Sequence, residues 1–249
     1  TENSHKAFPF LKKAYIWEYP NASPLKHLYY LIFTLLFLSC HTENKKAIST
    51  SNLSESMDSV LELVSADEMP REQKIKMLDS LSEIIVEGNN DTISRSNMIQ
   101  VANQYFYINE IEKYAASSKK IIEMGQEAKD TVDIARGYQY LGDYYTDRSD
   151  SDSAYYNFTQ SEKLYAKTDD RENFGRAKLK KAYLIFKVND LSLCEAIGIE
   201  VLKIAHEVKD LTLEYECYNF LSAVLIAENK YEEAIKYNNK ALETLKEFK

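Results

Sequence analysis

The sequence predicts an all-α fold, an α-solenoid built from antiparallel helical hairpins, and three observations support this prediction. Helix breakers are few, because Pro70 is the one proline beyond residue 24 and the 249 residues contain six glycines. Small residues recur at a spacing of about 40 residues. Aspartates recur at the same spacing, at the points where new hairpins should begin.

The recurring small residues divide the stretch 95–249 into four predicted hairpins. In the first helix of each hairpin they are spaced by 39, 40 and 40 residues: Asn103, Gly142, Ala182 and Ser222. In the second helix they keep these spacings: Ala115, Ala154, Cys194 and Ala234. Two antiparallel helices approach closely only where both carry small side chains, so each pair of positions predicts a helix crossing.

Aspartate marks the predicted start of three hairpins, at Asp130, Asp170 and Asp210. A carboxylate at the N-cap accepts hydrogen bonds from the free amides of the first helical turn. Ahead of the four hairpins, apolar periodicity predicts two more helices, over Ser54–Ser65 and Arg71–Glu87. We interpret residues 54–94 as a degenerate first hairpin or an N-terminal cap, because the end of a solenoid must present a polar face.

The second hairpin combines two sets of residues, Tyr138, Leu141, Gly142 and Tyr145 on one helix and Ala154, Phe158 and Ser161 on the next. The fourth hairpin is similar, with Tyr218, Leu221, Ser222, Leu225, Ala234 and Ala241. Both resemble the tetratricopeptide repeat, which implies a right-handed superhelix, although the period of 40 exceeds the usual ~34 residues. The first hairpin matches less well because Asn103 occupies its crossing, while Phe106 is expected in its core.

The resemblance implies a concave groove, lined by the first helices, that binds a protein or peptide ligand. Alignment of the hairpins places nine residues there: Asn97, Gln100, Gln104, Arg136, Gln139, Asp143, Arg176, Tyr183 and Asn219. Gln100, Gln139 and Asn219 are equivalent positions, and their amides can pair with a peptide backbone whatever its sequence. The Lys/Asn/Arg set with which chaperone-binding members grip a C-terminal carboxylate is not reproduced. The simpler interpretation of the nine residues is a solvated polar surface.

The N-terminal segment resembles a bacterial lipoprotein signal peptide. A basic pair precedes the apolar run Leu28–Leu38, which is too short to span a bilayer but has the length of a signal-peptide core. Ser39 and Cys40 follow, and in this class the cysteine is lipidated and becomes the mature N-terminus. We therefore expect a signal peptide over 25–40 with Cys40 as the lipidation site, then a polar tether over 41–53. Residues 1–24 fit no part of this pattern and are unassigned, and a start of translation at Leu25 would omit them. The alternative is an ordinary hydrophobic helix.

The residues offer no constellation typical of catalysis. No Cys/His/Glu set has metal-ligand spacing, and no glycine-rich phosphate loop occurs. We therefore predict a protein that is not an enzyme and uses neither a cofactor nor a metal. The net charge of −8 and the absence of a basic stripe argue against nucleic acid as a partner. Most of the nineteen tyrosines fall on or beside core positions, and Cys194 and Cys217 are interpreted as buried thiols, with a disulfide between them as the alternative.

Three functions are consistent with these patterns. The favoured one is an exported, lipid-anchored scaffold that binds proteins and faces the periplasm or cell surface of a Gram-negative bacterium. The second is the sensory half of a longer membrane-bound signalling or transcriptional regulator, because an apolar edge ends the fourth hairpin and further hairpins or a partner are expected to cover it. The third is a carbohydrate-binding outer-membrane lipoprotein, although such proteins usually carry long insertions between their helices.

Overall fold

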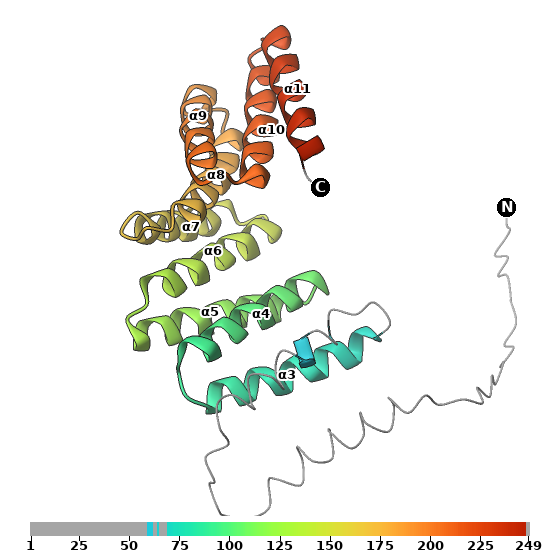
Figure 1. Cartoon of the computed structure of the whole chain (residues 1–249), viewed down its shortest axis with the longest axis vertical. Coiled ribbons are helices and arrows are strands. Elements are labelled where there is room, and N and C mark those ends of the chain that lie inside the picture. The colour runs from blue at the N-terminus through green and yellow to red at the C-terminus, as the bar shows by residue number, and fades with distance from the viewer. Residues whose placement is uncertain (1–58, 62–63, 65–68, 248–249) are drawn as a thin grey trace, which may run out of the picture. The chain divides into compact units, whose positions relative to one another are not determined.

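The computed structural model describes residues 59–61, 64 and 69–247, and every regular element within these residues is a helix. The helices, coloured along the chain in Figure 1, have the following bounds: α3 Arg71–Glu87, α4 Thr92–Tyr107, α5 Ile111–Ala128, α6 Thr131–Asp147, α7 Ser151–Tyr165, α8 Arg171–Lys187, α9 Leu191–Val208, α10 Leu211–Ala227 and α11 Tyr231–Glu247. The predicted signal peptide, the lipidation site Cys40 and the tether lie outside the described residues.

Consecutive helices pack as antiparallel pairs, which confirms the all-α repeat fold. The pairs α4–α5, α6–α7, α8–α9 and α10–α11 are hairpins, each closed by a turn of three residues. The hairpins begin at Thr92, Thr131, Arg171 and Leu211, which reproduces the spacing of 39, 40 and 40 residues. The helix predicted over Arg71–Glu87 is α3, and it packs against α4.

Each hairpin turn contains one residue in the left-handed conformation. Its φ lies between 59° and 64° in all four: Asn109, Ser149, Asn189 and Asn229. Lys129 and Lys209 adopt the same conformation at the ends of α5 and α9. The next amide then bonds five residues back, as from Lys230 N to Leu225 O at 2.8 Å, which closes the helix end. Asparagine tolerates this conformation, whereas a side chain such as lysine is strained there by about 1 kcal/mol.

Aspartate caps most helices of the repeats. The side chain accepts from backbone amides of the first turn at six helix starts: Asp91, Asp130, Asp150, Asp170, Asp190 and Asp210. The sequence predicted three of these caps from their position at hairpin starts. The other three were not predicted: Asp150 and Asp190 follow the tight turn inside a hairpin, and Asp91 precedes the first hairpin. A cap of this kind stabilises a protein by about 1 kcal/mol.

The helix crossings depend on small residues. A Cβ on Gly142 would lie 2.4 Å from Cε1 of Phe158, so the glycine makes room for that ring, which packs in one cluster with Ala154. In the fourth hairpin the Ser222 hydroxyl donates to Ala234 O at 3.2 Å, as the predicted crossing requires. Both cysteines, Cys194 and Cys217, are buried and free, so the alternative of a disulfide between them is wrong in this structure.

Candidate functional site

The nine predicted groove residues differ widely in their exposure. Gln100 and Tyr183 are exposed, and five are partly exposed: Gln104, Arg136, Asp143, Arg176 and Asn219. The remaining two are buried, because Asn97 is 2% exposed and Gln139 is 7% exposed. Little of these two side chains is open to a ligand in this structure.

The three equivalent amides do not form a uniform row of free groups. Gln100 is exposed, whereas Oε1 of Gln139 is enclosed and has no hydrogen-bond partner among the described residues. Nδ2 of Asn219 already donates to Tyr215 O at 3.1 Å, one turn earlier on the same helix. An interaction of all three amides with a peptide backbone therefore stays a prediction, and it would require Gln139 and Asn219 to change rotamer.

The groove arginine of α8 ties neighbouring hairpins together. Arg176 pairs with Asp210, the N-cap of α10, and its Nε lies 3.3 Å from Glu172. Arg95 on α4 makes a similar link between the first two hairpins, with Asp130 at 3.1 Å and Asp133 at 2.7 Å. In both caps Oδ1 accepts from backbone amides while Oδ2 accepts from the guanidinium. The guanidinium of Arg176 is thus already used in joining α8 to α10.

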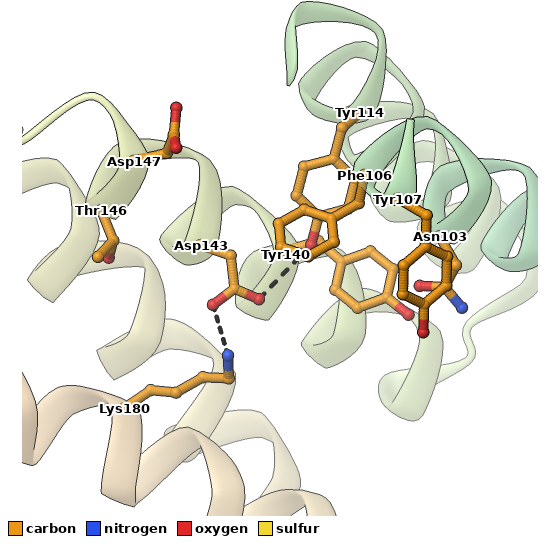
Figure 2. Close-up of a pocket in the computed structure, with 9 residues that line it drawn as sticks. All are labelled: Asn103, Phe106, Tyr107, Tyr114, Tyr140, Asp143, Thr146, Asp147 and Lys180. Carbon is orange, nitrogen blue, oxygen red and sulfur yellow. Dashed lines mark hydrogen bonds and ion pairs between the residues drawn. The ribbon is translucent and has the colours of Figure 1, made fainter. Parts of the chain in front are cut away.

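A pocket of about 460 Å³ opens where the first helices of three hairpins meet. We call it the aromatic pocket. Its lining, drawn in Figure 2, comes from α4, α5, α6 and α8: Asn103, Phe106, Tyr107, Tyr114, Tyr140, Asp143, Thr146, Asp147 and Lys180. Four aromatic rings thus share one pocket with two carboxylates and one ammonium group.

The four rings of the aromatic pocket form a continuous series of contacts. Phe106 lies edge-on to Tyr107, with ring centroids 6.3 Å apart. Phe106 also contacts Tyr114 at 5.1 Å, and Tyr114 contacts Tyr140 at 5.3 Å. Such tilted and edge-to-face pairs are favourable because the ring edge is positive and its face is negative. Phe106 is 47% exposed and Tyr107 is 77% exposed, so one end of the series is open to solvent.

Asp143 organises the polar side of the aromatic pocket. Its carboxylate accepts from Nζ of Lys180 at 2.6 Å and from the Tyr114 hydroxyl at 3.5 Å, as the dashed lines of Figure 2 show. Burial raises the pKa of the Asp143 carboxyl, and the Lys180 ammonium opposes that rise. Burial also raises the pKa of the hydroxyls of Tyr114 and Tyr140. Both hydroxyls are therefore neutral at physiological pH, and that of Tyr114 donates to Asp143.

Of the nine predicted groove residues, the aromatic pocket contains Asp143 alone. Phe106 was expected in the core but is half exposed, because the fully buried ring at this end of α4 is Tyr105. Tyr107, Tyr114 and Tyr140 were treated as part of a general excess of core tyrosines. A visible signal was available, since Phe106 and Tyr107 are adjacent aromatics at the very end of a helix, where one must face outward.

In the part of the chain that the structure describes, no group of three or more His, Cys, Asp or Glu side chains is arranged to hold a metal ion. No described helix is long and apolar enough to cross a membrane. A second pocket, bordered by α6 and α7, is lined by Leu141, Tyr145, Asp152, Ser153, Tyr156 and Asn157.

No protein-family model matches the chain, and no curated protein matches its sequence. Its structure is nevertheless similar to solved structures. Aspartyl phosphate phosphatase F from Bacillus subtilis gives a TM-score of 0.64 at 11% identity, covering 90% of this chain and 70% of that one. The apo form of RapI gives 0.64 at 13% identity, covering 77% and 71%. A signal transduction ATPase with numerous domains from Pyrococcus horikoshii, which has a tetratricopeptide repeat sensor, gives 0.60 at 19% identity, covering 76% and 29%.

These likenesses show a tetratricopeptide-like repeat fold. Sequence identities of 11% to 19% carry no activity from one protein to another, so the phosphatase named for the Bacillus subtilis structure is not assigned to this chain. What the chain binds has to be inferred from its own surface.

Proposed function

We propose, from the tetratricopeptide-like fold and the aromatic pocket, that residues 92–247 bind an extended segment of another protein. The observation that carries this proposal is the position of the pocket, whose lining comes from α4, α6 and α8, the first helices of three successive hairpins, and from α5. A ligand seated there contacts several hairpins at once, which suits an elongated chain better than a compact molecule.

The exposed aromatics beside this pocket favour a protein partner. Phe106 and Tyr107 present apolar surface to solvent, and Tyr183 on α8 adds a ring that is 43% exposed. Large aromatic side chains in such positions are enriched at protein interfaces, where burying them supplies most of the binding energy. The nearby Gln100 can in addition pair with a peptide backbone.

Site-specific photo-crosslinking in the native cell tests this proposal. A photoreactive amino acid replaces Thr146, which lines the aromatic pocket, Gln100, which precedes Asn103 by three residues on α4, or Lys163, an exposed residue on the second helix α7. We expect the two groove positions to crosslink to one contiguous segment of the same protein, while Lys163 does not. Equal crosslinking from all three positions, or none from Gln100 and Thr146, would refute binding in the groove.

Export and lipid anchoring form the second part of the proposal. The support is the apolar run Leu28–Leu38 followed by Ser39 and Cys40, a pattern that resembles a lipoprotein signal. Mass spectrometry of the protein from its native host should find a mature N-terminus at Cys40 carrying diacylglycerol, and Cys40→Ala should abolish it. An unprocessed Leu28–Leu38 segment would contradict both export by this route and anchoring at Cys40.

The alternative is that the repeats are the sensor of a larger signalling protein. The structure from Pyrococcus horikoshii favours it, because there a tetratricopeptide repeat sensor is one part of a multidomain protein and 29% of that chain is covered. The sequence of the complete gene discriminates between the two functions. An apolar run of about 20 residues followed by a kinase or helix-turn-helix pattern would establish the sensor.

A further inference from the structure

The aromatic pocket has the surface of a site for a cation. Two of its four rings, Phe106 and Tyr107, are exposed to solvent, and the faces of such rings attract a positively charged group within about 6 Å. Elsewhere in the described chain the protein supplies such cations itself. Arg171 lies 5.2 Å from the Phe174 ring centroid, Arg148 lies 5.7 Å from that of Tyr144, and Lys240 lies 5.6 Å from that of Tyr218.

None of the four pocket rings has such a cation among the described residues. The aromatic partners of all the lysines and arginines placed over rings are Tyr105, Tyr144, Tyr155, Phe158, Phe174, Tyr218 and Tyr237. The one ammonium in the pocket, that of Lys180, instead binds the Asp143 carboxylate and contacts Phe158. Arg136 interacts with the hydroxyl of Tyr140 and does not line the pocket.

The carboxylates of the pocket leave one negative charge uncompensated. Lys180 neutralises Asp143 at 2.6 Å. Asp147, at the end of α6, is exposed and forms no ion pair within the described part of the chain. The pocket therefore combines two exposed rings that no cation of the described chain covers with a free carboxylate, and the negative charge of the whole chain adds to its attraction for cations.

We infer that the aromatic pocket receives an arginine side chain of the bound segment, an inference that rests on the proposed function. The planar guanidinium stacks on aromatic rings, is weakly hydrated and forms two parallel hydrogen bonds to a carboxylate, here that of Asp147. A lysine ammonium is more strongly hydrated and gains less from flat rings. Asn103, whose side chain hydrogen-bonds the Tyr140 hydroxyl, lines the pocket on the side away from Asp147.

The test uses the full chain and four pentapeptides with blocked ends, Gly-Gly-X-Gly-Gly, in which X is arginine, citrulline, lysine or glutamate. Citrulline matches the shape of arginine but has no charge. Binding is followed by NMR through the side-chain amides of Asn103 and Gln100. We expect the arginine peptide to shift Asn103 in a saturable manner and the citrulline peptide to bind at least about fivefold more weakly.

Two matched variants test whether the Asp147 carboxylate binds the arginine of the peptide. Asp147→Asn should weaken the arginine peptide about fivefold and reduce its salt dependence. Asp152→Asn, which changes an aspartate of the second pocket, should leave binding unchanged. Equal binding of arginine and citrulline peptides, or equal effects of the two variants, overturns the inference. Crosslinks from Gln100 and Thr146 together with no preference for arginine would overturn this occupant and leave the proposed function standing.

Discussion

The hairpins α6–α7 and α10–α11 share the same backbone arrangement but differ in the chemistry of their side chains. Positions 80 residues apart are equivalent, and toward the C-terminal end of the first helix Asp143, Thr146 and Asp147 correspond to Ala223, Ile226 and Ala227. The second hairpin of the array thus has polar groups and tyrosines around a pocket. The fourth has a dense aliphatic core in which Leu221, Val224 and Leu225 are almost completely buried.

This difference teaches that the repeat frame and the binding site are specified by different residues. Turns, aspartate caps and small residues at the crossings recur in both hairpins and set the spacing of the helices. The pocket arises where aromatic and charged residues replace aliphatic ones, because they leave space and carry polar groups that face solvent. The four predictions below test this separation, from the largest expected effect to the smallest.

Removing the equivalent leucines should affect the two hairpins unequally. Leu221 is 1% exposed, so Leu221→Ala should lower the free energy of unfolding by about 2–5 kcal/mol through lost contacts and a cavity. Leu141→Ala should cost less, toward about 2 kcal/mol, because Leu141 already borders the second pocket. Urea unfolding measures both values. Equal losses would mean that the second hairpin is packed as densely as the fourth.

Filling the crossing of the second hairpin should also destabilise the fold. A Cβ at position 142 would lie 2.4 Å from Cε1 of Phe158, so the side chain of Gly142→Leu would overlap that ring. We expect the substitution to lower the free energy of unfolding by about 1–3 kcal/mol. The matched change in the fourth hairpin, Ser222→Ala, loses one hydrogen bond to Ala234 O and should cost about 1 kcal/mol. An unchanged melting temperature for Gly142→Leu would show that the crossing can open without loss.

The aspartate caps that also bind an arginine should contribute more to the free energy of unfolding than the caps that do not. We expect this for Asp130 in the second hairpin and for Asp210 in the fourth. Asp130→Ala and Asp210→Ala remove a cap and an ion pair to Arg95 or Arg176, and each should cost about 2 kcal/mol. Asp190→Ala removes only the cap of α9 and should cost about 1 kcal/mol. Thermal unfolding of the three variants compares them, and a ranking in which Asp190 matters most would contradict the shared frame.

The smallest effect is a gain in stability. Lys209→Gly, at a φ of 58°, relieves left-handed strain and should stabilise the protein by up to about 1 kcal/mol. Asn229→Gly, at a φ of 62°, should change stability little because asparagine already tolerates this conformation. A small rise in melting temperature for the first variant alone is the expected result. A loss of stability in Lys209→Gly would show that the lysine side chain makes contacts that outweigh the strain.

The candidate site was less accessible to sequence reasoning than the fold. Alignment of the hairpins identified Asp143 but could not separate buried from exposed members of one helix face, so Gln139 and Asn97 were expected in the groove although both are buried. Whether a polar side chain on that face is reachable depends on the size of its neighbours on the adjacent helices. Lys180, which reaches Asp143 across 37 residues of sequence, illustrates a partner that repeat alignment does not identify.

The sequence by itself determined the all-α repeat fold, the period and the hairpin starts, because these depend on local chemistry. Few helix breakers, small residues at fixed intervals and aspartates at the N-caps act within one helix or between neighbours in the chain. Only the tertiary structure decided that Phe158 fills the space beside Gly142 and that four aromatic rings and Asp147 surround one pocket. Those outcomes depend on how side chains from several helices pack together in the same space. The spacing of residues along the sequence does not specify that packing.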